Sequence, residues 1–255
     1  TVGGGSLIVT SGSGLGTGIV NVSAGAALNY AAAGDAPLAI GGNLTVTGGA
    51  NTAIGGSIGS TTTSASINVT GAATITDAAH NVNIFGIPGV TPTAGTYTLI
   101  SGGVGSALSP TTLPTLGKVY NNTNFTVGSL SRTATTLSVA VTPASELTTA
   151  YWDGGLAGAT NVWSVSNGST ASNWLATDGG AAQPLVPGAG TEVVISTSSP
   201  TAAPTATVLG ADMSIENLTI ADTTNGLGLN AEGYSLTISP TDPDTGITME
   251  AGVPP

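Results

Sequence analysis

Residues able to perform acid–base or nucleophilic chemistry are scarce in this chain. Its 255 residues contain one histidine, His80, and no cysteine. A Ser-His-Asp arrangement would need His80 together with Asp77, three residues before it, and an activated serine. GGSIG (55–59) matches the letters of G-x-S-x-G, but no helical pattern follows it as a nucleophile elbow requires. We therefore interpret His80 as a residue of a polar turn.

Other catalytic chemistries lack their residues as well. Glycoside hydrolysis needs two carboxylates in one cleft, and the first half offers only Asp35 and Asp77, far apart in sequence, before Glu146. A polysaccharide lyase would also need basic groups, but Lys118 and Arg132 are the only ones. The glycine-rich stretches GLGTG and GGGSL lack the lysine of a phosphate-binding loop. The sequence predicts that the protein is not an enzyme.

One acidic stretch has the beginning of a calcium loop. Asp242 and Asp244 stand two residues apart before a glycine in TDPDTG, but Glu250 comes too early for the last ligand of an EF-type loop. We interpret this stretch as an exposed acidic turn. A zinc site is not expected either, because zinc ligands are mainly histidine and cysteine, and the chain has one histidine and no cysteine. The sequence predicts neither a metal nor a cofactor.

All three tryptophans fall in one short window. Trp152, Trp163 and Trp174 are spaced eleven residues apart, and Tyr151 precedes the first. Indoles on one exposed face form glycan-binding platforms, so these four residues are candidate glycan contacts. The alternative, which we prefer, is that they form the core of a module otherwise poor in large side chains. An odd spacing would reverse the face along one strand, so turns are expected at 153–155 and 166–170.

The elements that would position these residues are short strands. Apolar and polar residues alternate with a period of two, and Gly and Asn separate the runs. No window has helical periodicity, so the chain is predicted to be all-β. The segments VNVSAGAAL (20–28), LTVTGGANT (44–52) and INVTGAATI (67–75) superpose as repeats, with Val20, Leu44 and Ile67 at equivalent positions. A period of roughly 23 residues favours a parallel β-helix, or β-solenoid, over an antiparallel sandwich.

Composition divides the chain into three parts. Residues 1–86 are predicted to form β-solenoid coils. A proline-containing interruption at 87–150, with strands at 96–101, 124–130 and 135–141, is predicted to be a capping or irregular β segment. Residues 151–255 are predicted to be a second β-strand-repeat module, in which NLTI (217–220) echoes NLTV (43–46). The formal charge is −1 over residues 1–150 and −10 over residues 151–255.

The second half carries a family resemblance. The stretches YWDGG, VWSVSNGSTASNW, PLVPGAGTEVVIS, MSIENLTI and NGLGLNAEGYSLTI follow one another. This series resembles the autotransporter-associated β-strand repeat family of exported bacterial surface proteins, and GSLIVTSGSGLGTGIVNVSAGAALNY resembles its Gly/Thr/Asn-rich coils. The resemblance implies a parallel β-helix that serves as a passenger, stalk or adhesive surface. It supplies no catalytic residue.

These observations lead to one expected function and one alternative. We expect a structural protein of the extracellular space or the bacterial cell surface, either a β-solenoid stalk or a subunit that self-associates end to end into a filament or sheath. The alternative is an adhesin or glycan-binding passenger module. The acidic, lysine-poor composition disfavours nucleic acid as a partner, and no 18-residue apolar span predicts a transmembrane helix. The start at Thr1 suggests a processed form or a fragment.

Overall fold

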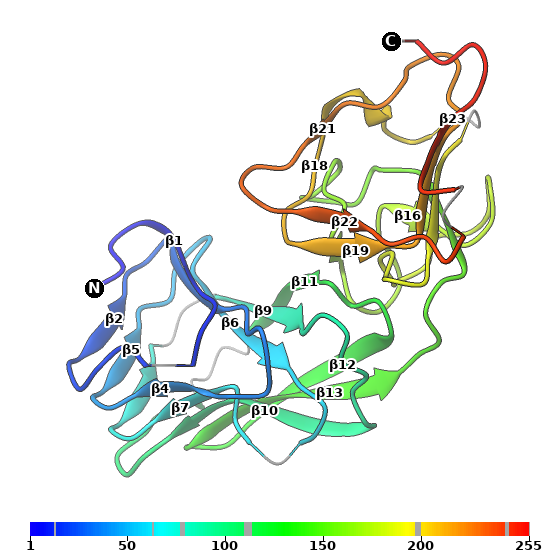
Figure 1. Ribbon diagram of the computed structural model, residues 1–255. Coiled ribbons are helices and arrows are strands. Elements are labelled where there is room, and N and C mark those ends of the chain that lie inside the picture. Colours follow the sequence, from blue (N-terminus) through cyan, green and yellow to red (C-terminus); the bar gives the residue numbers. More distant parts are fainter. Residues whose placement is uncertain are drawn as a thin grey trace. The chain divides into compact units, whose positions relative to one another are not determined.

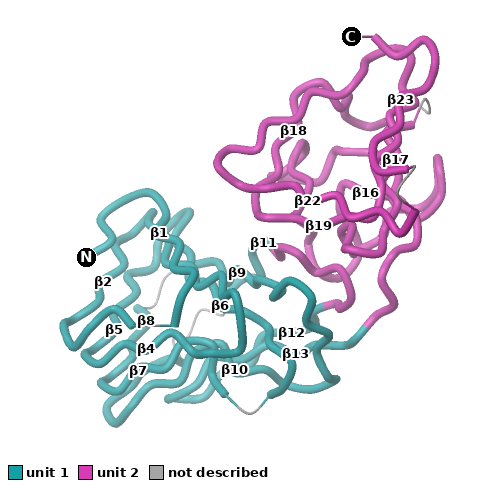
Figure 2. Tube along the Cα trace, in the orientation of Figure 1, with its two compact units in different colours: residues 1–118, 127–143 teal, residues 119–126, 144–255 magenta. Residues whose placement is uncertain are grey.

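The chain is all-β, as the sequence predicts. The computed structural model describes residues 1–12, 14–62, 64–76, 80–109, 114–196, 200–242 and 245–254. Strands account for 42% of these residues and helix for 1%, and none of the sheets that they form closes on itself. The chain forms two compact units, Thr1–Lys118 with Val127–Pro143, and Val119–Thr126 with Ala144–Pro255 (Figure 2). The three-part division at 86/87 and 150/151 stays a prediction.

The first unit contains three sets of parallel strands (Figure 1). Set A is β2 (Val20–Val22), β5 (Leu44–Val46) and β8 (Ala73–Ile75). Set B is β1 (Gly5–Val9), β3 (Ala26–Tyr30), β6 (Ala53–Ile58) and β9 (Asn81–Gly86), followed by β11 (Thr115–Tyr120). Set C is β4 (Leu38–Ile40), β7 (Ile67–Val69) and β10 (Gly95–Gly102). From β2 to β10 the chain visits sets A, B and C in fixed rotation and adds one strand to each set per round.

Alternation places the apolar residues of these strands in columns. Val20 pairs with Leu44, and Leu44 pairs with Ala73, all of them buried. The residues between them, such as Asn21, face outward, so the strands β2, β4 and β7 each read buried–exposed–buried. This is the burial expected of a pleated strand with one face on a core. Small aliphatic side chains therefore fill the first unit.

The predicted repeat register is half right. The pairing of Val20 with Leu44 confirms the first step of the repeat. The next step is wrong, because Leu44 pairs with Ala73, while Ile67 pairs with Leu38 in set C. The alternating triplets of the three sets are interchangeable, and the connections lengthen along the chain. Sequence similarity therefore matched strands that belong to different sets.

Two buried asparagines connect the strands of set B. Asn29 and Asn83 lie on either side of Gly55 in the register. Because Gly55 has no side chain, Asn83 Nδ2 reaches across it and donates to Asn29 Oδ1 at 3.2 Å. Asn29 Nδ2 then donates to Ser6 Oγ at 3.1 Å. The amide groups thus link strands β1, β3 and β9 across a glycine, and a buried polar group finds its partner.

The proline-containing interruption has longer, antiparallel strands. β10 pairs with β13 (Thr136–Pro143), beside which lies β12 (Phe125–Arg132). The strands predicted at 96–101, 124–130 and 135–141 are confirmed to within two residues. That this segment caps the coils stays a prediction.

The second unit has one larger sheet and two strand pairs. The sheet order is β16 (Trp174–Leu175), β14 (Thr149–Trp152), β17 (Glu192–Ile195), β20 (Asn217–Ile220) and β23 (Ile247–Met249). β14, β17, β20 and β23 are parallel. The parallel pairs are β18 (Thr207–Val208) with β21 (Leu229–Asn230), and β19 (Met213–Ile215) with β22 (Leu236–Ile238). From β17 to β23 the chain again visits three sets of strands in fixed rotation.

Two further elements complete the second unit. β15 (Val165–Ser166) pairs antiparallel with Val119 and Tyr120 at the end of β11. A short 3₁₀ turn, η1 (Pro204–Ala206), precedes β18. Among the described residues, no helix is long and apolar enough to cross a membrane.

Candidate functional site

The three tryptophans come together in the core of the second unit. Trp152 and Trp174 are paired residues of the antiparallel strands β14 and β16, and Trp163 lies in the connection between these strands. The ring centroids of Trp152 and Trp174 are 5.1 Å apart, and those of Trp163 and Trp174 are 5.0 Å apart, both with edge-to-face geometry. This arrangement is one that aromatic pairs prefer. Aliphatic residues surround it: Ala150, Val186, Val193, Ile195, Leu209, Met213, Ile215 and Leu218.

Two of the three indoles donate a hydrogen bond from their N–H group to a backbone carbonyl. Trp152 Nε1 donates to the carbonyl of Ala202 at 2.8 Å, and Trp174 Nε1 donates to the carbonyl of Trp163 at 2.8 Å. Trp163 Nε1 is buried without a hydrogen-bond partner within the described part of the chain. The indole cluster therefore combines a large apolar surface with two specific hydrogen bonds.

The expected turns between the tryptophans are present. Gly154 and Gly155, just after Trp152, have φ angles of 70° and 81°, a region that favours glycine. In the second turn, Asn167 Oδ1 accepts hydrogen bonds from the backbone N–H groups of Ser169, Thr170 and Ala171. The turn predicted at 166–170 is confirmed, whereas the one predicted at 153–155 lies just beyond that stretch, where the N–H of Ala159 donates to the carbonyl of Leu156 at 2.9 Å.

Burial decides what these side chains can do. The exposed fractions are 3% for Trp152 and 0% for Trp163 and Trp174. A sugar stacks on an open ring face, and none of the three indoles presents one. Tyr151, on the other face of β14, is half-buried. The core interpretation of the tryptophans accounts for this geometry, while glycan binding itself stays a prediction.

Tryptophan emission separates the two interpretations directly. Because the indoles are buried, titration with polysaccharides is expected to leave the emission maximum and intensity of the folded chain unchanged. Free tryptophan in the same titration controls for absorption by the sugar. A saturable change in emission would show that a glycan reaches the cluster.

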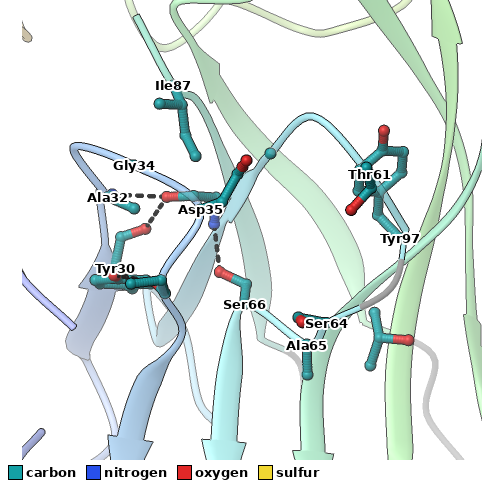
Figure 3. A pocket seen from close by; sticks show the side chains of 14 residues that line it. Tyr30, Ala32, Gly34, Asp35, Thr61, Ser64, Ala65, Ser66, Ile87 and Tyr97 are labelled. Carbon is teal, nitrogen blue, oxygen red and sulfur yellow. Dashed lines mark hydrogen bonds between the residues drawn. The ribbon is translucent and has the colours of Figure 1, made fainter. Parts of the chain in front are cut away.

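A small hollow in the first unit is the other candidate site. It measures about 90 Å³, and its lining includes Tyr30, Asp35, Ser57, Ser66 and Tyr97 (Figure 3). Such a volume has room for a few water molecules and for little else.

The polar groups of this hollow are engaged with the protein itself. Tyr30 Oη donates to the carbonyl of Ala36 at 2.5 Å, and burial raises the pKa of its phenol. Ser57 Oγ donates to the carbonyl of Tyr30 at 2.7 Å, and Ser66 Oγ accepts from the N–H of Ser57 at 2.6 Å. These bonds connect β3 with β6, and β6 with the residue that precedes β7, so we assign the hollow no ligand.

Asp35 at the rim of the hollow is held by the following repeat. Its carboxylate accepts hydrogen bonds from Ser60 Oγ at 2.6 Å and from the N–H of Ser60 at 3.0 Å. These bonds, the side-chain bond first, lower the pKa of Asp35 below its ordinary value of 3.8. A carboxyl group with a lowered folded-state pKa stabilises the fold above its unfolded-state pKa. That contribution is lost as the pH falls through the folded-state pKa.

Asp35→Asn is therefore expected to flatten the acid limb of the stability profile. Between pH 5 and pH 2, the urea midpoint of the wild type should fall more steeply than that of the variant, because the other carboxyl groups titrate alike in both. Urea unfolding at intervals across this range measures the difference. Parallel profiles would contradict the assigned role of the Ser60 contacts.

Three residues considered for catalysis or metal binding remain to be placed. His80 is buried, while Asp77 lies outside the described residues, as does Asp244 of the acidic turn. Within the described ranges, no three His, Cys, Asp or Glu side chains gather as a metal site would require.

The comparisons with known proteins add no relative. No protein-family model, no curated protein and no solved structure matches this chain.

Proposed function

We propose that both units are short parallel β-solenoids and that the chain is a structural component of an extracellular or cell-surface assembly. The observation that carries this proposal is the rotation of the chain through three sets of parallel strands in each unit. A chain that advances one strand per set and per round winds as a coil, and successive coils stack at the strand spacing of about 4.8 Å. Such a body provides length and stiffness.

The two NLT segments support a common plan for both units. Asn43 Oδ1 accepts from the N–H of Ala72 at 2.9 Å, and Leu44 N donates back to the carbonyl of Ala72 at 3.0 Å. In the second unit, Asn217 Oδ1 accepts from the N–H of Gly246 at 3.0 Å, and Leu218 N donates to the carbonyl of Gly246 at 2.8 Å. The partner lies at the same distance along the sequence in both cases. The same side chain thus bridges two successive coils in each unit.

Removing this bridge is expected to cost a small, defined amount of stability. Asn43→Ala and Asn217→Ala should each lower the free energy of unfolding by about 0.5–1.5 kcal/mol, the net value of one hydrogen bond. Asn217→Ala should cost more, because its bond is partly buried whereas that of Asn43 is exposed. Urea unfolding at pH 7 measures both.

Aspartate provides the matched control for this bridge. Asn43→Asp and Asn217→Asp keep an acceptor oxygen at the same position and should retain most of the stability. Equal losses for alanine and aspartate would mean that the hydrogen bond has no role.

Carboxylates also link successive coils, which accounts for part of the acidity without catalysis. Asp212 Oδ1 accepts from Ser235 Oγ at 2.9 Å, in the next round of the chain. Glu216 Oε1 accepts from Thr241 Oγ1 at 2.5 Å, again one round later. The spacing matches one turn of the proposed coil. These acids therefore connect neighbouring coils, as Asp35 does with Ser60.

The proposed location and family come from composition and resemblance. Charged residues make up 6% of the chain, only two of them basic, and Gly accounts for 39 residues. Gly/Thr/Asn-rich coils of this kind resemble the autotransporter-associated repeats of exported bacterial proteins. We propose the same role here, as a passenger or stalk at the cell surface.

The open ends of the two units support self-association. β1 and β23 are terminal strands of their sheets, and both expose large apolar side chains. An uncovered strand of this kind is a template for pairing with another chain. We propose that copies of the chain associate end to end. Sedimentation velocity over a wide concentration range should show the average mass increasing with concentration, and a constant monomer mass would contradict self-association.

Engineered disulfides test the coil itself, independently of assembly. The chain has no cysteine, and Thr45 pairs with Thr74 across β5 and β8. Neighbouring strands bring Cα atoms within the range that a disulfide spans. Thr45→Cys with Thr74→Cys should therefore crosslink on mild oxidation. Thr45→Cys with Asn68→Cys, the pair that the sequence repeat would align, should remain reduced, and the opposite result would overturn the proposed stacking.

A further inference from the structure

We propose that β23 of one copy of this chain receives β1 of a second copy as its next parallel strand, with Leu7 stacked on Ile247 and Val9 on Met249. The inference gives the polarity and register of the end-to-end association and rests on that proposed function. A head-to-tail contact of this kind uses two different surfaces, so it repeats from copy to copy and generates an open filament or a closed ring.

In β1 and β23, the side chains that continue the rows of core residues are exposed on one side. In the second unit, the column Val193, Leu218, Ile247 has exposed fractions of 0%, 5% and 64%. In the first unit, Leu7 is 40% exposed, while Leu28, its partner in the register, is 0% exposed. Ile247 and Leu7 therefore occupy core positions that lack a covering coil on one side. Stacking one on the other would continue both columns.

At the edge of β23 that faces away from β20, the free backbone N–H and C=O groups are those of the core-facing residues. Successive residues of a strand direct their N–H and C=O groups to opposite edges. The carbonyl of Gly246 accepts from the N–H of Leu218 at 2.8 Å, and the N–H of Glu250 donates to the carbonyl of Ile220 at 2.9 Å, so Gly246 and Glu250 face β20. Ile247 and Met249 therefore direct their backbone groups to the open edge.

The backbone of β1 has the complementary pattern. The carbonyl of Val9 accepts from the N–H of Ala31 at 2.9 Å, so Val9 and Leu7 face β3. Ser6 and Ile8 consequently direct their backbone groups to the open edge. With Leu7 on Ile247, the N–H of Ile247 meets the carbonyl of Ser6, and the N–H of Ile8 meets the carbonyl of Ile247. The side-chain register and the hydrogen-bond register agree, as they do between β20 and β23.

Contacts between two β23 strands lack this agreement. Two β23 strands paired in parallel would place Ile247 opposite Thr248, an outward-facing residue, and the core columns would break. An antiparallel pair of β23 strands would bring together two modules whose residues 151–255 hold ten acidic and no basic side chains. Residues 1–34 carry no charged side chain, so β1 approaches the acidic end without like-charge repulsion. The head-to-tail contact is favoured on both counts.

Two proline variants block one end each. Ile8→Pro and Met249→Pro remove an N–H from the open edge of β1 or β23 without removing a hydrogen bond within the copy, a position where a strand tolerates proline. Val104→Pro is the control, because Val104 precedes Gly105 (φ 86°) in a turn closed by a hydrogen bond from Ser106 N to Gly103 O. Proline is favoured at that position of such a turn. Circular dichroism verifies that all three variants fold.

Sedimentation velocity of the single variants and of their mixture then gives the answer. Each blocked variant should associate at least about tenfold more weakly than the wild type, and Val104→Pro should assemble normally. An equimolar mixture of Ile8→Pro and Met249→Pro should form a dimer and no larger species, since only one intact β1 and one intact β23 can meet. Dimers of Ile8→Pro alone would reveal a β23–β23 contact and overturn the inference.

The remaining outcomes separate the inference from the function on which it rests. If the wild type assembles and both blocked variants assemble equally well, the junction lies elsewhere and only the inference fails. If the wild type remains monomeric, end-to-end association fails as a whole. The stacked coil itself is judged separately by the Thr45 and Thr74 crosslink.

Discussion

Replacing Trp174 by alanine is expected to lower the free energy of unfolding of the second unit by about 3–5 kcal/mol, the range for truncating a buried aromatic side chain. Trp174 has no exposed surface and contacts both other indoles edge to face. Its loss leaves a cavity that the short strands around it cannot close. Urea unfolding followed by circular dichroism measures the effect, with the transition of the first unit as an internal reference.

Phenylalanine substitutions separate the indole hydrogen bonds from the packing. Trp174→Phe removes a donor that bonds to the carbonyl of Trp163, whereas Trp163→Phe removes an N–H that has no partner among the described residues. Trp174→Phe should therefore cost about 1 kcal/mol more than Trp163→Phe. Equal losses would show that the Trp174 bond contributes nothing. A small loss for Trp174→Ala would contradict the role of the tryptophans as the core of the second unit.

Gly42→Ala is expected to destabilise the first unit by about 1–3 kcal/mol through overpacking. A methyl group at Gly42 would overlap the carbonyl oxygen of Gly18 and lie 2.6 Å from that of Thr17, both in the preceding repeat. Backbone atoms cannot move aside as a flexible side chain does, so the repeats must separate at this corner. Urea unfolding of the variant at pH 7 measures the loss.

Gly18→Ala is the matched control at the same corner. No heavy atom lies within 4 Å of the added methyl group, and Gly18 has no positive φ angle. This substitution should be neutral or stabilise the protein by up to about 1 kcal/mol, because alanine restricts the unfolded chain. The two variants thus have opposite expected signs. Destabilisation by Gly18→Ala as large as that by Gly42→Ala would mean that close stacking is not the cause.

Several features of the fold follow from local sequence. Alternation of apolar and polar residues predicts the strands, including the long ones near 96–101 and 135–141, because a period of two places one face on a core whatever the partner strand is. Asn167 predicts the turn at 166–170, because its side chain accepts hydrogen bonds from the backbone N–H groups that follow it. The concentration of all three tryptophans in one window of an otherwise small-residue module predicts the core of that module.

The pairing of the strands was decided by the tertiary structure alone. Within set B, Leu28 pairs with Leu7 on one side and with Ile54 on the other, and Ile54 pairs with Val82. The three steps along this column differ in length, so no constant period aligns the strands. The alternating triplet Leu44–Val46 resembles the triplets of set C, such as Leu38–Ile40 and Ile67–Val69, so its own pattern does not select set A. What selects the partner is the length of the connections and the close approach at corners such as Gly42.

The same holds for the polar contacts that connect distant repeats. Nothing local to Asn29 indicates that Asn83 will reach it across Gly55, or that Asp35 will accept from Ser60. The similarity between NLTV and NLTI was visible in the sequence. The hydrogen bond that each of their asparagines accepts from the following repeat was not. The sequence by itself determined that the chain is all-β and where most of its strands lie, because alternation along a strand is a local property. Only the tertiary structure decided which strands are neighbours, because a stacked register depends on contacts between residues that lie far apart along the chain.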